Sequence, residues 1–488
     1  IRSVVPGGPA AKSKQVNEKD RIVAVAQGTN APVDVVDMEL EKVVQMIRGA
    51  KGTEVRLTIS PDGNRTARKV VKLVRDEIKL EDSEAKAKLV ETPDGHGGTN
   101  RIGIIDLPSF YATVNLGSGG RTTPKSTSAD VAKLVKRLKE EKVQGIIIDL
   151  RTNPGGSLEE AVKFTGLFIK GGPIVLARDF DNHVQVDSDP DSSQLYDGPL
   201  VVMINRFSAS ASEIAAAALQ DYGRALIVGD ISTHGKGTVQ NLNPLKPFVW
   251  PASPNATNDP GTLKVTIRKF YRISGASTQL KGVVPDIVLP DVLNYSTHIG
   301  EVSLDNPMPW DTIHSVSYDK YNLVEPYLGQ LKKNSDQRIA TNQDFLYVKE
   351  DIAQFQKSQA EKTATINEAD AIKERQRIYA QNKAREAERL ARKSDGVKVY
   401  EITVQNADQP GLVEYKADKD ADNLTSTGTS GDDATEATTV DAASGVNSTN
   451  VTQTANSDTN SVKSVVSDKK SAPPFDPMLD ETERILLD

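Results

Sequence analysis

The stretch from residue 199 to residue 240 restricts the fold of this chain more than any other part of it. An apolar run at 199–204 indicates a buried strand, and a serine-rich turn at 208–212 leads from it into an alanine-rich helical pattern. A second short apolar run, at 225–229, indicates another strand. A strand, a helix and a strand in this succession are typical of an α/β fold built on a parallel sheet.

The residues at the two ends of this unit suit nucleophilic catalysis. A helix directs its unpaired N–H groups and the positive end of its dipole at the residue that starts it, which favours a serine whose reaction generates an oxyanion. The sequence Gly-Lys-Gly-Thr-Val-Gln follows the second strand at 235–240. Because side chains alternate along a strand, Lys236, Thr238 and Gln240 would share one face. We interpret the serine and the lysine as a nucleophile–base pair.

A purely structural interpretation of the serine turn is also open. The residues Ser210–Glu213 fit the capping box, in which a serine caps the helix and a glutamate three positions later returns the hydrogen bond. This alternative gives no role to Lys236, which is flanked by two glycines. An exposed lysine is protonated at neutral pH, so a lysine base must be desolvated. We therefore predict that Lys236 is buried, has few acids nearby and is hydrogen-bonded to Gln240 or to backbone.

Histidine offers a rival general base. The chain has five histidines, and only His234 lies near the serine–lysine pattern. Together with Asp221 it could complete a Ser–His–Asp set, or it could be an exposed loop imidazole. No histidine or acidic cluster has the spacing of a metal site, so we expect neither a metal nor another cofactor.

The longer pattern resembles the C-terminal processing serine peptidases, in particular their tail-specific branch in Gram-negative bacteria. The likeness extends from residue 1 to about residue 400. The motifs that carry it are F-S-A-S-A-S-E-I at 207–214, L-Q-D-Y-G-R-A-L at 219–226, G-K-G-T-V-Q at 235–240, I-I-D-L-R-T-N-P-G-G at 147–156, K-F-Y-R at 269–272 and K-G-V-V-P-D-I at 281–287.

This resemblance implies a role for each of three motif residues. Ser210 matches the nucleophile by its place within F-S-A-S-A-S-E, Lys236 matches the general base, and Gln240 matches the residue that orients the lysine. The chain departs from the family at 230–234, where the turn before the lysine is one residue longer than usual.

The resemblance also implies an oxyanion hole and two supporting acids. The backbone N–H groups of Gly155 or Gly156 and of Ala211 would hold the oxyanion, because glycines between a strand and a helix let the backbone approach a ligand closely. Removing one such donor costs about a hundredfold or more in rate. We interpret Glu213 and Asp221, at opposite ends of the helix, as structural supports.

The N-terminal region, residues 1–77, has the order of elements of a PDZ domain. Strands are predicted at 20–25 and 55–59, and Asp37 is expected to cap a helix between them. A PDZ domain adds the C-terminus of a peptide as an extra strand. The early strand and the loop that would hold the ligand carboxylate are expected to precede Ile1, so a longer natural chain is predicted.

The remaining chain is expected to form an α/β multidomain protein. Residues 78–300 would form a core that resembles Clp protease and crotonase architecture, by analogy of fold alone. Long solvated helices are predicted in the charge-rich part of 301–417. Residues 418–473 are rich in Ser, Thr, Asn, Asp and Ala, a composition typical of a disordered linker, and 474–488 would dock as a short helix.

Composition excludes several classes of function. The net charge of −7 and the lack of a long basic stripe argue against a nucleic-acid partner. No run of about twenty apolar residues occurs, so we expect no membrane span. The absence of cysteine excludes disulfides and thiol catalysis.

The expected function is a serine endopeptidase that recognises apolar C-terminal tails of proteins through its PDZ unit. The resemblance further implies a periplasmic location and a lipoprotein adaptor as partner. Two other classes stay open: a non-catalytic PDZ scaffold that binds peptides, and a crotonase-like acyl-transferring enzyme, which would need a pocket for a thioester cofactor. A PDZ unit beside a complete Ser–Lys–Gln set favours the peptidase.

Overall fold

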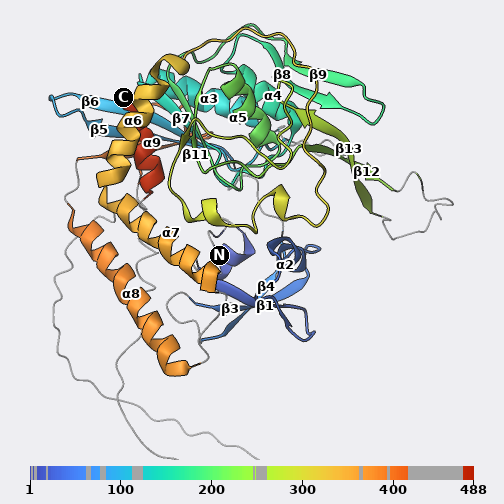
Figure 1. Ribbon diagram of the computed structural model, residues 1–488, viewed down its shortest axis with the longest axis vertical. Coiled ribbons are helices and arrows are strands. Elements are labelled where there is room, and N and C mark those ends of the chain that lie inside the picture. Colours follow the sequence, from blue (N-terminus) through green and yellow to red (C-terminus); the bar gives the residue numbers. More distant parts are fainter. Residues whose placement is uncertain are drawn as a thin grey trace, which may run out of the picture. The chain divides into compact units, whose positions relative to one another are not determined.

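The architecture of the protein comes from a computed structural model. The N-terminal part, the α/β core with its helical extension, and the final helix can all be followed (Figure 1). The residues that the structure describes are 1, 4, 8–17, 20–61, 67–76, 84–112, 125–245, 248, 261–361, 367–392, 396–415 and 476–488. The predicted linker at 418–473 lies outside these residues.

The N-terminal part is a four-stranded antiparallel sheet in the order β2-β1-β3-β4. Its elements are α1 (Pro9–Ser13), β1 (Arg21–Gln27), β2 (Val33–Asp34), α2 (Leu40–Ile47), β3 (Glu54–Ser60) and β4 (Lys69–Val74). Alternate residues of β3, including Val55, Leu57 and Ile59, form its core. The prediction that Asp37 caps the helix is wrong: α2 begins at Leu40.

The reason for that error is local turn chemistry. The carboxylate of Asp34 accepts a hydrogen bond from the N–H of Val36, which forms a turn of the kind that aspartate favours. Asp37 follows in the left-handed region, with φ of 61°, and Glu39, not Asp37, is the residue that precedes the helix. The helix therefore begins three residues later without a side-chain cap.

The core is organised around an eight-stranded mixed sheet in the order β14-β11-β10-β7-β6-β5-β15-β16. Strands β6, β7, β10, β11 and β14 run parallel, whereas β5, β15 and β16 are joined to the sheet by antiparallel pairing. The bounds are β5 (Lys86–Pro93), β6 (Thr99–Asp106), β7 (Gly145–Asp149), β10 (Leu200–Ile204), β11 (Leu226–Gly229), β14 (Ile287–Val288), β15 (Lys398–Thr403) and β16 (Val413–Glu414).

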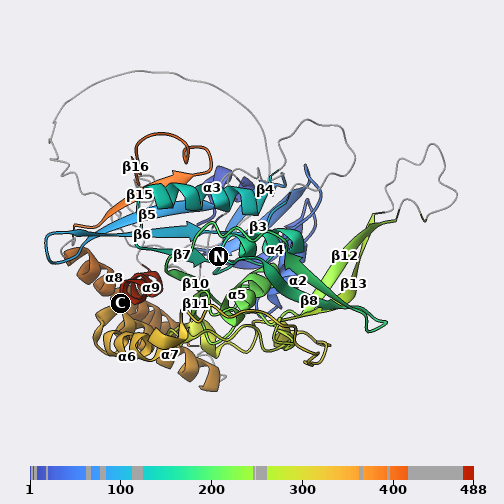
Figure 2. The ribbon, with the colours of Figure 1, turned by 90° about the horizontal axis from the view of Figure 1, so that it is seen from above.

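Helices cover both faces of this sheet, which explains the continuous apolar runs in the sequence. On β7, Ile146 and Ile148 pack with the first group of helices, whereas Ile147 packs with the second. Figure 2 shows α3 and α9 on opposite sides of β5, β6 and β7. The first group is α3 (Thr127–Glu140), α4 (Leu158–Gly166) and α5 (Ala211–Asp221), and the second is α6 (Glu325–Thr341), α7 (Gln343–Glu361) and α9 (Pro477–Leu487).

A second, antiparallel sheet in the order β12-β13-β8-β9 adjoins α4 and α5. Its strands are β8 (Gly172–Arg178), β9 (Val184–Asp189), β12 (Thr238–Pro244) and β13 (Thr262–Tyr271). Two short helical turns follow, η3 (Val292–Tyr295) and η4 (Glu301–Ser303). The predicted glutamine lies on β12, and the predicted lysine lies in the loop that precedes this strand.

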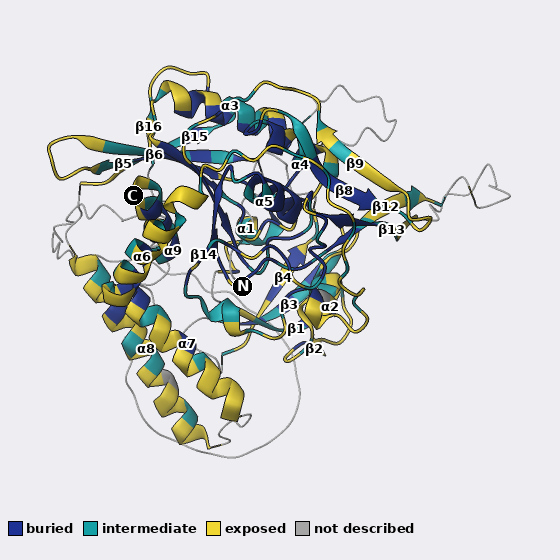
Figure 3. Cartoon of the chain, turned by 45° about the horizontal axis from the view of Figure 1, so that its top comes forward, coloured by how far each residue is buried: buried dark blue, intermediate teal, exposed yellow. Residues whose placement is uncertain are grey.

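The predicted solvated helices are present in the C-terminal part. Helix α8 (Glu368–Ala391) lies beside α7 and is exposed along most of its length (Figure 3). The two helices are joined by ion pairs, in which Arg385 contacts Asp351 and Glu350. None of the helices among the described residues combines the length and apolar composition that crossing a bilayer requires.

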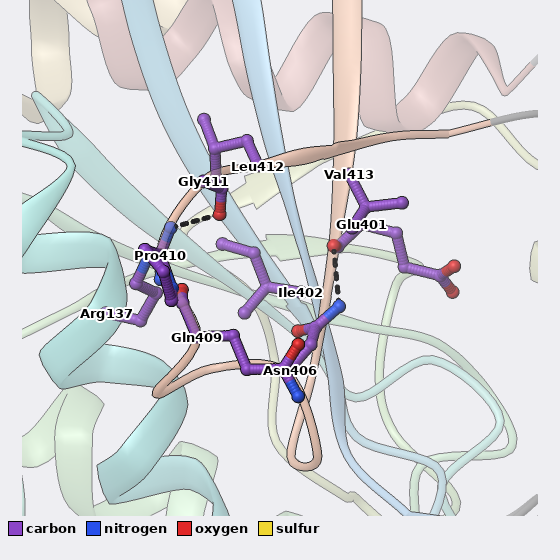
Figure 4. Close-up of a pocket in the computed structure, with 9 residues that line it drawn as sticks. All are labelled: Arg137, Glu401, Ile402, Asn406, Gln409, Pro410, Gly411, Leu412 and Val413. Carbon is purple, nitrogen blue, oxygen red and sulfur yellow. Dashed lines mark hydrogen bonds between the residues drawn. The ribbon is translucent and has the colours of Figure 1, made fainter.

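A buried arginine fastens the loop between β15 and β16 to the core. Arg137 of α3 donates hydrogen bonds to the backbone carbonyls of Ala407, Gln409 and Gly411. Figure 4 shows Arg137 beside Gln409 and Gly411, with the hydrogen bond to Gly411 dashed. The cavity between these groups measures about 30 Å³, enough for one water molecule. This site therefore serves as a structural clasp, since it has no room for a larger ligand.

Candidate active site

The predicted nucleophile lies at the start of α5 in an unusual backbone conformation. Ser210 has φ of 58° and ψ of −113° and precedes the first helical residue, Ala211. Holding a serine in such a sparsely populated backbone conformation costs on the order of 1–3 kcal/mol, and these conformations cluster at functional sites. Ser210 also lines a cavity of about 460 Å³. Strained geometry and access to a cavity thus coincide at one residue.

The two neighbouring serines have structural partners. Ser208 is fully buried, and its Oγ donates to the carbonyl of Leu150 at 2.8 Å. Ser212 is equally buried and donates to the carbonyl of Asn153 at 2.9 Å. Only Ser210 of the three lines the cavity. The choice of Ser210, which the sequence motif made by position alone, therefore gains a geometric reason.

Lys236 reaches the same cavity from the loop before β12. Its Nζ donates to Gln240 Oε1 at 3.1 Å, the hydrogen bond that we predicted. Burial lowers the pKa of Lys236, and the charge of Lys264 lowers it further. The prediction of few acids nearby is only partly met, because Glu301 and Glu213 act in the opposite direction. Strand β12 begins at residue 238, so Lys236 lies just before the strand and not on it.

Glu213 connects the serine and the lysine through their backbones. Its Oε2 accepts from the N–H of Ser210 at 2.7 Å and from that of Lys236 at 3.1 Å. Its Oε1 accepts from the Thr233 hydroxyl and from the Gly235 N–H. Burial raises the pKa of this carboxyl to about 7, against the four hydrogen bonds that favour its ionised form. The glutamate side of the predicted capping box is thus present, and it also joins two candidate catalytic residues.

The glycine turn after β7 approaches the nucleophile closely. A side chain on Gly155 would lie 2.6 Å from the carbonyl oxygen of Ala209 and 2.8 Å from Cβ of Ser210. The N–H of Gly155 donates to the side chain of Asn153 at 2.9 Å, so it already has an acceptor. No hydrogen bond among the described residues uses the N–H of Gly156, which lines the cavity.

Ala211 supplies a second N–H group at the same place. It is the first residue of α5, so its N–H has no acceptor within the helix. Ala211 lines the cavity together with Gly156 and Ser210. Of the three predicted oxyanion donors, the structure therefore brings Gly156 and Ala211 to the cavity and gives the N–H of Gly155 a different partner.

The alternative Ser–His–Asp set is not assembled. Asp221 ends α5, about 15 Å along the helix from its start, and its carboxylate pairs with Arg272 at 2.7 Å. His234 does not line the cavity, and its Nδ1 lies 3.8 Å from Glu301. Burial lowers the pKa of His234, which agrees with neither an exposed loop imidazole nor a histidine held by Asp221.

One polar loop that belongs to this site was not identified from the sequence. The Thr278 hydroxyl donates to the carbonyl of Lys236 at 2.8 Å, and Gln279 Oε1 accepts from the N–H of Gly237 at 2.8 Å. Gln279 in turn donates to Glu301 of η4. These residues hold the lysine segment in addition to Glu213. They are far apart in sequence from Lys236, and no motif marks them.

The cavity has a mixed lining, in which Ser157, Thr238, Gln240 and Lys264 are polar besides the candidate catalytic residues Ser210 and Lys236. Its apolar lining comes from α4, α5 and the second sheet and consists of Pro154, Leu158, Ile214, Val239, Leu242 and Phe270. Among the described residues, no group of three or more histidine, cysteine or acidic side chains could hold a metal ion. A serine at a helix start, a desolvated lysine and two backbone donors around one cavity define a candidate nucleophile–base site on an α/β core.

Comparisons with known proteins identify the family. The sequence profile described as "Peptidase family S41" matches residues 101–289, and that of the "C-terminal domain of tail specific protease" matches 295–488. A PDZ domain profile matches residues 1–60. The chain belongs to peptidase family S41 and carries both the PDZ domain and the C-terminal domain of tail-specific proteases. The α/β core, the PDZ unit and the helical C-terminal region are thereby confirmed.

Individual relatives agree with this assignment. The tail-specific protease of Haemophilus influenzae is 41% identical over 355 residues, which cover 72% of this chain and 48% of the relative. The carboxy-terminal-processing protease of Bartonella bacilliformis is 32% identical over 271 residues, 54% of this chain and 55% of the relative. The chain thus spans about half the length of these curated relatives.

Among solved structures, the photosystem II D1 C-terminal processing protease matches 59% of this chain and 67% of its own. For this pair of structures the TM-score is 0.41 and the sequence identity is 26%.

Proposed function

We propose that this chain is a serine endopeptidase in which Ser210 is the nucleophile and Lys236 the general base. The observation that carries the proposal is that both side chains line one cavity, where burial lowers the pKa of Lys236 and so favours the neutral amine that a base requires. Membership of peptidase family S41 supports the reaction class. The chain spans about half the length of its curated relatives, and the activity of the whole protein is part of the proposal.

The proposed reaction proceeds in two halves. Lys236 takes the proton of Ser210 Oγ as that oxygen bonds to the substrate carbonyl carbon, and the N–H groups of Gly156 and Ala211 stabilise the oxyanion. The peptide bond then breaks, Lys236 returns the proton to the leaving amine, and an acyl-enzyme is left on Ser210. Water, deprotonated by Lys236, hydrolyses the acyl-enzyme and restores both residues. Gln240 orients the amine through its hydrogen bond.

The Lys236 amine and the Ser210 hydroxyl must come within hydrogen-bond distance before the first proton transfer. Among the hydrogen bonds of the described residues, the Lys236 amine bonds Gln240 and not Ser210. Hydrogen bonds between catalytic groups commonly tighten only once substrate is bound. We assign Glu213 the task of holding the two residues in register, because one of its oxygens accepts from both of their backbone N–H groups. Asp221 and Gly155 support the same arrangement through the helix end and the turn.

The proposed substrates are proteins with apolar C-terminal tails. A PDZ domain binds the C-terminus of a peptide by strand addition, and the PDZ match at residues 1–60 supports tail capture by this unit. The apolar lining of the cavity suits small apolar side chains next to the bond that is cut. The family resemblance further supports a periplasmic location and a lipoprotein adaptor.

We retain the domain division made from the sequence as part of the proposal. The units are 1–77, 78–300, 301–417, the linker 418–473 and the docking segment 474–488. In the described part of the last unit, α9 packs on the sheet beside β7 and β10.

The proposal is tested by cleavage of a loosely folded reporter protein in two versions, one ending in apolar residues and one in charged residues. The complete protein should cut the apolar version faster. Ser210→Ala and Lys236→Met should each lower kcat/KM at least about a thousandfold, while His234→Ala should stay within a few-fold of the unaltered protein. Loss of cleavage in His234→Ala with Lys236→Met still active would move the base to His234. Binding of the tail without cleavage by any form would favour the non-catalytic PDZ scaffold.

A further inference from the structure

A second lysine lines the candidate active-site cavity. Lys264 of β13 stands directly opposite Leu242 of β12, and Gln240 is paired with Thr266 in the same ladder. Directly paired residues project on the same face of a sheet, and diagonal neighbours are within reach of long side chains. Lys264 is therefore a neighbour of Gln240, the residue that accepts the hydrogen bond of Lys236. Both lysines line the cavity of about 460 Å³.

The charge of Lys264 is not neutralised by a neighbour. The side chain is exposed, and no ion pair or hydrogen bond between described residues involves its ammonium group. Lysine 269 of the same strand, by contrast, is paired with Asp311 at 2.5 Å. The ammonium group of Lys264 can therefore act on the site through its charge.

Charged groups reach Lys236 from three other sides. Glu213 approaches from α5, Glu301 from η4, and His234 precedes Lys236 in the same loop. Glu213 and Glu301 favour the protonated amine, and Lys264 opposes them from β13. Replacing Glu213 disturbs up to four hydrogen bonds, whereas the Glu301 carboxylate accepts one, from Gln279. Lys264 and Glu301 are therefore the opposing charges that can be altered one at a time.

We propose that Lys264 is a further functional residue of this site, which tunes Lys236 through its charge across the shared cavity. The inference rests on the proposed function insofar as Lys236 is the base. Like charges in one cavity repel, so the charge of Lys264 favours the neutral form of the half-buried Lys236. Lys264 thus compensates for the acids that surround the base.

The proposal predicts the direction in which the titration of Lys236 shifts when each charge is removed. Removing the charge of Lys264 makes Lys236 harder to deprotonate, so the titration of Lys236 moves to higher pH. Removing the charge of Glu301 moves it to lower pH. Both shifts should shrink in 1 M salt, where the screening length falls from about 10 Å to about 3 Å. A change in packing would not respond to salt in this way.

The experiment measures the titration of Lys236 directly and without catalysis. The complete protein carrying Ser210→Ala is treated briefly with an amine-acylating reagent between pH 6 and 11, and mass spectrometry gives the extent of modification at Lys236. Lys264→Met, Lys264→Arg and Glu301→Gln are compared on this background. Arg268→Met is the matched control, because Arg268 lies on the same strand but bonds Gln185 and does not line the cavity.

Four results together support the proposal. Lys264→Met raises the pH midpoint of Lys236 labelling and slows labelling below that midpoint by about three- to tenfold, as expected for one screened charge. Lys264→Arg restores the original midpoint, and Glu301→Gln lowers it. Arg268→Met leaves the midpoint unchanged. An unchanged midpoint in Lys264→Met, or a shift that persists in 1 M salt or in Lys264→Arg, overturns it. The acid limb of kcat/KM in proteins with Ser210 intact should move with the same signs. If no form cleaves while the labelling shifts occur, the proposed function fails and the charge coupling stands.

Discussion

Glu213 offers the sharpest quantitative prediction, because one buried carboxylate satisfies four donors. In Glu213→Ala the N–H groups of Ser210, Gly235 and Lys236 lose their acceptor, together with the hydroxyl of Thr233. A buried donor without an acceptor costs about 1–3 kcal/mol, so the three amides alone cost about 3–9 kcal/mol. Amide hydrogen exchange of α5 should accelerate at least about a hundredfold, and kcat/KM should collapse.

Glu213→Gln is the matched variant. Its amide oxygen can still accept from Ser210 and Lys236, while its NH₂ group meets the donor of Gly235, so about one hydrogen bond is lost at a cost of about 1–3 kcal/mol. We expect it to keep more of both protection and activity than Glu213→Ala. Protection of α5 within a few-fold of the unaltered protein in Glu213→Ala would refute the reasoning.

The same pair of proteins tests a pH dependence. Burial raises the pKa of Glu213 to about 7 in the folded protein from the ordinary value of 4.5. The folded state then holds this proton at a pH where the unfolded chain has released it, so the contribution to stability is largest below pH 4.5. It falls as the pH rises to 7, by about 3 kcal/mol, and is constant above. Glu213→Gln should lack this decline. A stability that rises between pH 5 and 7 relative to Glu213→Gln would contradict the prediction.

Three further changes have expected outcomes. Gly156→Ala places a Cβ 2.1 Å from the carbonyl oxygen of Phe110, at a φ of 149° that alanine rarely adopts. The displaced N–H group should lower kcat/KM at least about a hundredfold. Gly329→Ala is the control, because a Cβ at Gly329 meets no atom within 4 Å. Asp221→Asn leaves Arg272 without its ion pair and should cost about 3 kcal/mol, read as a lower melting temperature, and an unchanged melting point would contradict this. Arg137→Ala releases three backbone carbonyls, so hydrogen exchange of the loop before β16 should rise while kcat/KM is unchanged.

The parts of the site that could be predicted from sequence are those encoded within one short stretch. The apolar run before the serines and the alanine pattern after them predicted β10 and α5, and the glycine-flanked lysine followed in the next strand–turn unit. Local periodicity and a family motif suffice there. The hydrogen bond between Lys236 and Gln240 was predicted from the family motif, in which Gln240 orients the lysine.

The parts that could not be predicted depend on contacts between distant residues. Gln279 and Thr278 hold the lysine segment from a loop about forty residues later, and polar residues in a loop give no periodic signal. Lys264 enters the cavity only because β13 pairs with β12 in a register that includes a bulge. Gly156 is preferred over Gly155 as an oxyanion donor because the Asn153 side chain already accepts the hydrogen bond of the Gly155 N–H group.

The central claim, that Ser210 is a nucleophile activated by Lys236, is tested most directly by covalent labelling with a serine-reactive fluorophosphonate. Trypsin then releases the peptide 207–224, which contains Ser208, Ser210 and Ser212, and fragmentation locates the label. We predict labelling at Ser210 alone, which is lost in Lys236→Met and retained in His234→Ala. Labelling at another serine, or at Ser210 with equal rate in Lys236→Met, would contradict it.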